Sequence, residues 1–238
     1  MSLGFVVAEW EAVSPSLRTP VAWAAWARGG TPDETTESQV PLPPLLRRRI
    51  TPIGQMAFAA ALGTPEISQT RLVFASRHGE FRRTLTLLEA LAGSDGVSPA
   101  DFSLSVHNAL MGLLSMWAKN PRGHTTIASG TDTFLCALIE ATAMLATDPT
   151  TPVLLVYYDE PLPAPYDSFN GPAETALALA LLLKSAGGGQ QTDVEIEASS
   201  ADATTAQALG FIRFLLSDEY LAGSRALRLS WRAKRAAA

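Results

Sequence analysis

Residues 123–146 constrain the fold of this chain more than any other stretch. A short β-prone run at 125–128 meets Ser129-Gly130, and after Asp132 comes a long apolar segment in which Glu140 is the only charge. A helix that is apolar nearly all round belongs in the interior of a domain. The stretch therefore predicts a strand, a tight turn and a buried central helix, an arrangement on which many α/β enzymes place a nucleophile.

The start of this helix carries several polar groups. Thr131 or Asp132 can cap the helix by accepting hydrogen bonds from its free N–H groups, and the helix N-terminus stabilises an anion placed there. The only cysteine, Cys136, lies more than a turn further along the apolar helix. It is predicted to be a small buried hydrophobic residue and not a nucleophile.

The rest of the chain alternates predicted strands and helices. Strands are expected at 5–8, 71–75, 152–158 and 227–231. Helices are expected at 21–28, 52–62, 81–91 and 204–216. Surface loops are expected at 31–44 and 159–171, and a frayed tail at 232–238. This order predicts one α/β domain, 1–238, with a mixed sheet and helices on both faces.

Composition excludes several classes of protein. With a net charge of −5, the chain lacks the positive charge that is typical of nucleic-acid-binding proteins, and one cysteine excludes an internal disulfide. No apolar run approaches the ~20 residues that span a bilayer, and the first residues do not resemble a signal peptide. We therefore expect a cytoplasmic protein. The chain is 47% hydrophobic and 17% charged, which suggests a buried interface with another chain.

The turn at 127–131 resembles the nucleophile turn of β-ketoacyl synthases, members of the thiolase superfamily. Ile127-Ala-Ser-Gly130 places Thr131 where those enzymes have their cysteine. Ser76-Arg-His-Gly-Glu80, Ser105-Val-His-Asn-Ala109 and Arg47-Arg-Arg49 carry the same resemblance. It covers roughly residues 5–200 and only the first half of a ketosynthase, so the catalytic histidines of the second half have no counterpart.

The resemblance implies a thiolase-like half fold with a mixed, mostly parallel five-stranded sheet and helices on both faces. The resemblance also decides between helix and strand for one segment. Residues 176–184 have the composition of a helix, but ketosynthases have a strand there. Residues 192–198 alternate cleanly after a glycine-rich turn, so we predict a hairpin between the two segments.

The resemblance is to chain length factors of the aryl polyene type, which are inactive partners of ketosynthases. It implies a subunit that condenses nothing on its own, forms a heterodimer with an active β-ketoacyl synthase, and limits the length of the acyl chain. An acyl carrier protein is implied as a partner of the complex. No catalytic residue, cofactor or metal is implied.

Two groups of candidate residues follow from the resemblance. The candidates for the interface and for control of chain length are Phe102, Leu104, Val106, His107, Asn108 and Met111. The candidates for contact with the partner or the carrier protein are Arg47, Arg48, Arg49, Arg77 and His78. For many of them a plain role in packing or in solvation remains open.

Two alternatives of other classes remain. One is a small serine hydrolase using Ser129 with His124 or His78 and Asp132, although the residues around Ser129 do not form the Gly-x-Ser-x-Gly elbow. The other is a homodimeric scaffold that binds an acyl chain or a carrier protein.

Overall fold

The structure is a computed structural model that describes residues 2–30, 42–171, 175–185, 192–198, 206–217, 220–224 and 229–235. Its strands are β1 (Ser2–Val13), β2 (Arg71–Ala75), β3 (His124–Ile127), β4 (Val153–Asp159), β5 (Leu177–Lys184), β6 (Thr192–Ala198), β7 (Tyr220–Ser224) and β8 (Leu229–Arg235). Its α-helices are α1 (Pro20–Ala27), α2 (Pro44–Arg47), α3 (Pro52–Leu62), α4 (Phe81–Ala92), α5 (Pro99–Leu104), α6 (Ala109–Trp117), α7 (Thr133–Thr147) and α8 (Gln207–Ser217).

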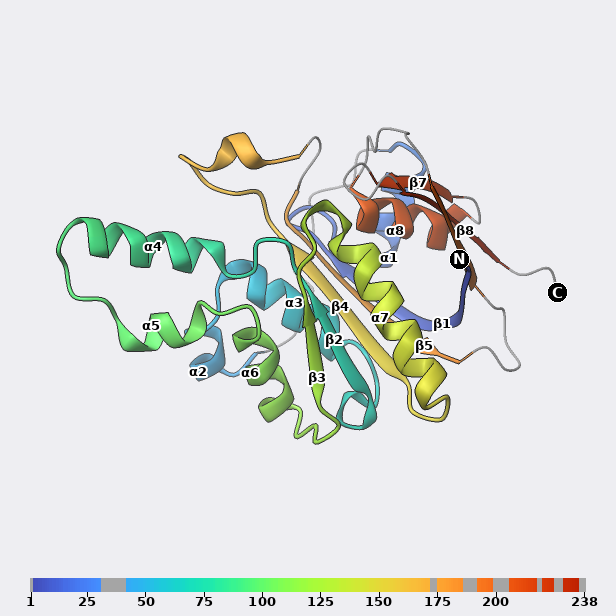
Figure 1. Cartoon of the computed structure of the whole chain (residues 1–238), viewed down its shortest axis with the longest axis horizontal. Helices are drawn as coiled ribbons and strands as arrows, with labels where there is room; N and C mark the ends of the chain where they lie inside the picture. The colour runs from blue at the N-terminus through green and yellow to red at the C-terminus, as the bar shows by residue number, and fades with distance from the viewer. Residues whose placement is uncertain are drawn as a thin grey trace.

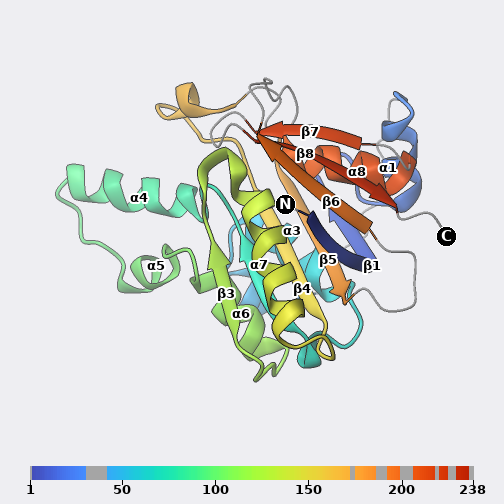
Figure 2. The ribbon, with the colours of Figure 1, turned by 45° about the vertical axis from the view of Figure 1, so that its right-hand side comes forward.

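Within these ranges the strands form one sheet in the order β3-β2-β4-β5-β1-β6-β8-β7 (Figure 1). The first five positions are the predicted mixed, mostly parallel sheet: β2 is parallel to β3 and β4, and β5 alone runs in the opposite direction. The long strand β1 joins this part to an antiparallel part that the sequence analysis did not foresee. Val6–Val13 pair with β5, whereas Ser2–Phe5 pair with β6 (Figure 2).

Two predictions at the C-terminal side are corrected. Residues 177–184 are a strand, as expected, but they do not form a hairpin with 192–198, because β5 lies between β4 and β1 and β6 lies between β1 and β8. Residues 232–235 belong to β8 and not to a frayed tail. Most of the loop expected at 31–44 lies outside the described residues, and α2 begins at Pro44.

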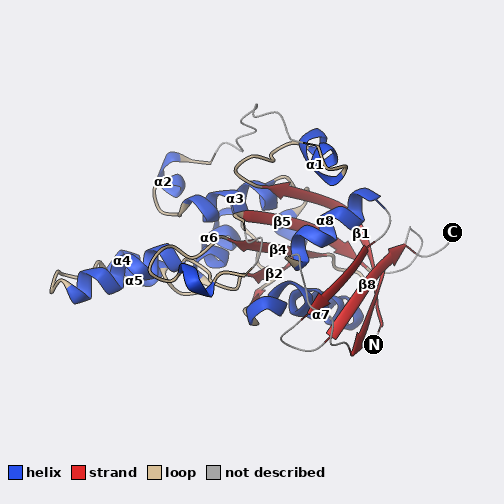
Figure 3. Cartoon of the chain, turned by 90° about the horizontal axis from the view of Figure 1, so that it is seen from above, coloured by secondary structure: helices blue, strands red, loops and turns tan. Residues whose placement is uncertain are grey.

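Helices cover both faces of the sheet, as predicted (Figure 3). Successive residues of a strand point to opposite faces, so β5 contributes Leu179 and Leu181 to a core under α7 and α8, and Ala178 and Ala180 to a core under α3 and α6. Both sets are wholly buried. This is why β5 reads as one continuous apolar run.

Helices α4 and α5 form an arm that projects from the sheet beyond its β3 edge (Figures 1 and 3). Leu87 is the only buried residue of α4, and α5 has none. The arm instead exposes large apolar side chains: Leu88, Leu91 and Phe102, with Val106 just beyond α5. In the part of the chain that the structure describes, no helix is long and apolar enough to cross a membrane.

Candidate functional site

The turn between β3 and α7 is built by the backbone of residues 129–133. Gly130 adopts a φ of 57°, which favours glycine. Thr133 fixes the turn from within: its hydroxyl accepts a hydrogen bond from the Ser129 N–H at 2.9 Å and donates one to the Gly130 carbonyl at 2.7 Å. The strand, turn and buried helix predicted for this stretch are therefore present, with a short 3₁₀ turn at Gly130–Asp132 before α7 begins.

A side chain from α8 satisfies the free N–H at the start of α7. The side-chain oxygen of Gln207 accepts a hydrogen bond from the Leu135 N–H at 3.1 Å, and its amide nitrogen donates one to Asp132 Oδ1 at 2.8 Å. Neither Thr131 nor Asp132 makes the predicted side-chain cap, because Asp132 is turned towards Gln207 and Thr131 is exposed. No local pattern indicates Gln207, because it lies 75 residues from Asp132 in the sequence.

Thr131, at the nucleophile position of the family resemblance, has none of the surroundings of a nucleophile. Its side chain is exposed, and its hydroxyl forms no hydrogen bond within the described ranges. A hydroxyl becomes a nucleophile when an adjacent base removes its proton. Cys136 is a free thiol that is only partly buried on α7, so the prediction of a fully buried residue was too strong.

The hydrolase triad with His124 is not formed. His124 is the first residue of β3 and Ser129 lies beyond its last, so they are separated by the length of a strand that rises about 3.3 Å per residue. Asp132 is 1% exposed and is held by Gln207 instead of orienting a histidine. The hydroxyl of Ser129 has no hydrogen-bond partner among the described residues, so no base contacts it there.

The loop Ser76–Glu80 is fixed by Asp159 at the end of β4. Asp159 accepts hydrogen bonds from the backbone N–H groups of Arg77, at 2.7 Å, and His78, at 3.2 Å, and from the Ser76 hydroxyl, at 3.4 Å. The Arg77 guanidinium donates to the carbonyl of Phe169 at 3.1 Å. Arg77 and His78 are thus part of a well-held loop at the carboxyl ends of β2 and β4.

His107 packs against this loop. Its ring Nε2–H donates to the Ser76 carbonyl at 3.2 Å, so this histidine satisfies a backbone group. A Cβ at Gly79 would lie 3.0 Å from the His107 ring, and Gly79 has a φ of 59°. Both facts favour glycine in the Ser76–Glu80 motif.

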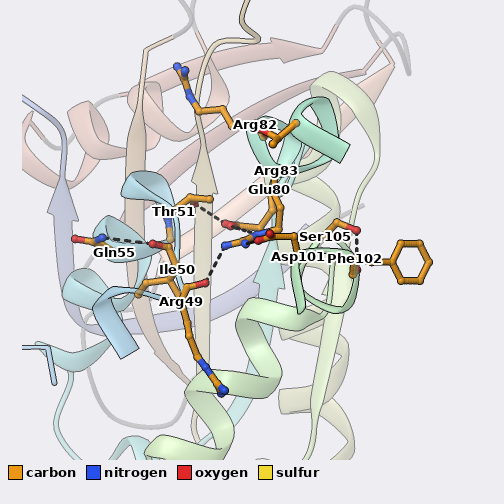
Figure 4. Close-up of polar contacts among 12 residues, drawn as sticks. Arg49, Ile50, Thr51, Gln55, Glu80, Arg82, Arg83, Asp101, Phe102 and Ser105 are labelled. Carbon is orange, nitrogen blue, oxygen red and sulfur yellow. Dashed lines mark hydrogen bonds and ion pairs between the residues drawn. The ribbon is translucent and has the colours of Figure 1, made fainter. Parts of the chain in front are cut away.

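A second polar network joins the arm to the body of the domain (Figure 4). The Thr51 hydroxyl donates to Glu80 Oε1 at 2.9 Å. The Arg83 guanidinium donates to the carbonyl of Arg49 at 2.8 Å, forms a short ion pair with Asp101 of α5, and lies 3.9 Å from Glu80 Oε2. We call Thr51, Glu80, Arg83 and Asp101 the arm network.

Glu80 is the most buried acid of the arm network, with 4% exposure. Burial raises the pKa of its carboxyl group above the ordinary value, and the hydrogen bond from Thr51 and the charge of Arg83 oppose that rise. Burial, with the charges of Glu80 and Asp159, also raises the pKa of the nearby Tyr158. Within the arm network, the cost of burying the Glu80 carboxyl group is thus partly offset by its contacts with Thr51 and Arg83.

The interface candidates separate into exposed and buried residues. Phe102 is 63% exposed and Val106 48% exposed, Asn108 is exposed, and Leu104 is partly buried. Met111 is 0% exposed and belongs to the core between α6 and the sheet. Met111 cannot enter a partner's tunnel from that position, so it is removed from the candidates.

The three consecutive arginines lie at the surface, where α2 ends at Arg47 and the chain continues towards α3. Their side chains are exposed, and none of the three forms an ion pair with a carboxylate in the described part of the chain. Arg47 makes one long contact, 3.5 Å, to the carbonyl of Leu42. The positive charge of Arg47, Arg48 and Arg49 is thus presented to solvent.

The three charged residues that hold the arm, Glu80, Arg83 and Asp101, were not among the predicted site residues. Glu80 closes a motif that we noted, but its burial could not be deduced from a local pattern. Arg83 and Asp101 are 18 residues apart, and each reads as an ordinary surface charge. Their only local signal is the position of Asp101 in the first turn of α5, where acids are favoured.

Comparison with known proteins finds similarity over most of the chain. The sequence profile described as "Beta-ketoacyl synthase, N-terminal domain" matches residues 23–234. A search of curated protein sequences finds no match. A chain of the solved complex "Ketosynthase (ApeO) in Complex with its Chain Length Factor (ApeC) from Xenorhabdus doucetiae" is 26% identical, with a TM-score of 0.86, and the match covers 98% of this chain and 100% of that chain.

More distant structures share the fold alone. The ishigamide ketosynthase/chain length factor is 16% identical with a TM-score of 0.63, and the match covers 83% of this chain and 68% of that chain. A chain of the complex of AntDE with the acyl-carrier protein AntF is 13% identical with a TM-score of 0.59, over 77% of this chain and 62% of that chain. With its strand, turn and central helix in place, the chain has a thiolase-like half fold and belongs to the β-ketoacyl synthase N-terminal domain family.

Proposed function

We propose that this chain is a non-catalytic chain length factor of the aryl polyene type, which forms a cytoplasmic heterodimer with an active β-ketoacyl synthase and limits the length of the acyl chain. The observation that carries the proposal is the turn before α7. It keeps the backbone that presents a nucleophile, but Thr131 points to solvent and Gln207 satisfies an N–H of the first turn of the helix.

The chemistry of condensation explains why this turn is informative. The reaction needs a nucleophile to carry the acyl chain and hydrogen-bond donors to stabilise the enolate formed on decarboxylation. A cysteine at a helix N-terminus forms a thiolate readily, whereas a threonine hydroxyl needs a base. The described surroundings of Thr131 supply none, so the partner synthase must carry the acyl chain.

Exposed apolar surface supports association with another chain. Leu91 of α4 is 61% exposed and Phe102 of α5 is 63% exposed, and both lie on the projecting arm. Exposed apolar side chains that lie together on a surface often mark a site of association with another protein. The similar chain in the ApeO–ApeC complex is matched over its entire length, so a chain of this size occurs within a ketosynthase assembly.

The arm also supplies the residues that would set the chain length. Phe102 and Leu104 lie on α5 and Val106 lies just beyond it, and we assign these residues to the end of the partner's acyl tunnel. A bulky side chain there shortens the space for the growing chain. The exposed positive charge of Arg47, Arg48 and Arg49 fits an acidic acyl carrier protein that docks on the complex.

The assembly is tested by co-expressing this chain with a ketosynthase that is encoded beside it, with a tag on this chain only. We expect native mass spectrometry to show a one-to-one heterodimer, and malonyl-dependent chain extension to require both chains. A stable homodimer that leaves the synthase in the flow-through would support the homodimeric scaffold instead.

A further inference from the structure

Helix α5 carries Phe102, yet the helix has no buried residue of its own. Apolar burial is what normally fixes the position of a short helix on a domain. Its own N-cap, a hydrogen bond from the Asp101 N–H to the Ser98 hydroxyl at 3.2 Å, stabilises the helix locally but does not join it to the domain. Apolar burial on α5 is limited to the partly buried Leu104, so polar contacts contribute to where α5 lies.

Arg83 makes those contacts. Its side chain is 12% exposed, and its guanidinium bonds Asp101 on one side and the carbonyl of Arg49 on another. A guanidinium is planar and directs its donors in fixed directions, so it fixes the angle between its partners as well as their distance. One side chain thus joins α5 to the segment that leads into α3.

The other end of the network is anchored in the core. Glu80 lies beside Arg83 and accepts the hydrogen bond of Thr51, whose oxygen also caps α3 by accepting from the Gly54 N–H at 3.3 Å. In α3, Ala57 and Phe58 are 0% exposed. Arg83 therefore connects α5, through Glu80 and Thr51, to α3, a helix that is packed on the sheet.

Phe102 follows Asp101 directly and projects the other way. Figure 4 shows its ring pointing away from the arm network, while Asp101 points into the network. A residue that fixes Asp101 therefore fixes the part of the α5 backbone from which the Phe102 ring projects. We propose that Arg83 is a positioning residue that sets the acyl chain length through Asp101 and Phe102; this rests on the proposed function as a chain length factor.

The test compares product lengths made by the reconstituted heterodimer with four variants of this chain. Arg83→Lys keeps the charge but cannot hold all the partners in their directions, and Asp101→Asn weakens the same bond at a half-exposed site. Phe102→Ala removes the side chain that they position. Arg82→Lys is the matched control, because Arg82 lies on the same helix and pairs with Glu160 near the surface.

We expect Arg83→Lys and Asp101→Asn to raise the fraction of over-length products about threefold or more, which needs only a small change in the competition between extension and release. Arg82→Lys should leave the distribution unchanged. The double variant Arg83→Lys, Phe102→Ala should match Phe102→Ala alone, because the first residue acts through the second. Loss of stability by itself would reduce the amount of heterodimer without lengthening the product.

The outcomes separate the inference from the function on which it rests. If Phe102→Ala lengthens the product and both Arg83→Lys and Asp101→Asn give the native distribution, the positioning role is wrong and the chain length factor stands. If the wild-type chain forms no heterodimer, the proposed function is wrong and the inference goes with it. If the heterodimer forms but Phe102→Ala leaves the product unchanged, the assignment of Phe102 is wrong and so is the inference. Should Arg83→Lys not fold, Asp101→Asn decides.

Discussion

Gln207 donates a hydrogen bond to the buried carboxylate of Asp132 at 2.8 Å and accepts one from the first turn of α7 at 3.1 Å. This pair ties α8 to the place where the family mounts its nucleophile. The amide of Gln207 thus pairs with one carboxylate oxygen and with the helix N-terminus in the interior, with Asp132 at 1% and Gln207 at 7% exposure. The turn is thereby stabilised as a structural element.

Gln207→Leu should destabilise the fold. Leucine has a similar volume, but it leaves the Leu135 N–H and Asp132 Oδ1 without partners, at about 1–3 kcal/mol for each buried group. We expect the free energy of unfolding to fall by roughly 2–4 kcal/mol in urea titrations. Gln55→Leu is the matched control, because Gln55 donates only long hydrogen bonds near the surface, at 3.3 and 3.4 Å. Equal losses for the two variants would contradict the role of Gln207.

Thr131→Ala and Ser129→Ala should each leave chain extension by the heterodimer within about twofold, because neither hydroxyl contacts a base. The rate is measured with purified acyl carrier protein and malonyl donor. Replacing the partner's own cysteine serves as the control and should abolish extension. A fluorophosphonate probe should not label this chain; labelling that disappears in Ser129→Ala would revive the hydrolase.

Met111 and Phe102 should give opposite results, although both are large apolar residues of one segment. Met111→Ala creates a cavity in the core and should lower the free energy of unfolding by about 2–5 kcal/mol. Phe102→Ala, at a site that is 63% exposed, should change stability by no more than about 0.5 kcal/mol and yet lengthen the product. Thermal unfolding and product analysis are run on the same preparations. A destabilised Phe102→Ala with unchanged products would place that ring in the core instead.

Glu80 predicts a pH dependence of stability. Burial raises its pKa above the ordinary value of 4.5, so the folded state keeps a proton at a pH where the unfolded state has lost it. The folded state is therefore stabilised as the pH falls towards 4.5, and it loses that stabilisation as the pH rises through the raised value.

Glu80→Gln removes the titration of this one group. All other carboxyl groups are retained, so their contributions to the pH dependence of stability cancel when the variant is compared with the wild type. We expect the stability of the wild type relative to Glu80→Gln to decrease as the pH is raised from about 4.5 to about 7, in urea midpoints measured on both proteins. An increase over that range would mean that Arg83 and Thr51 outweigh burial.

The local structure of this chain was largely predictable. The Thr51-Pro52 start of α3, the apolar strand β4 and the buried helix α7 follow from capping, continuity and periodicity, which act over a few residues. The five-stranded mixed sheet followed from the resemblance. Residues 177–184 show the limit of local reasoning, because propensity favours a helix and burial between β4 and β1 makes a strand.

What could not be predicted depends on contacts between distant residues. The expected hairpin failed because β1, from the start of the chain, pairs with both β5 and β6. Gln207 and Arg83 were missed for the same reason: each reads as an ordinary polar residue until the fold brings it to Asp132 or Asp101. For Met111 the choice between the interface and the core stayed open, because an apolar residue on a short helix gives no sign of which face is buried.

The central claim is that this chain takes part in acyl transfer without carrying the acyl group. The most direct measurement is the intact mass of each subunit after the heterodimer is incubated with acyl-loaded carrier protein and then denatured. We predict an acyl adduct on the ketosynthase subunit and none on this chain. An adduct on this chain, mapped to Thr131, Ser129 or Cys136, would contradict the account.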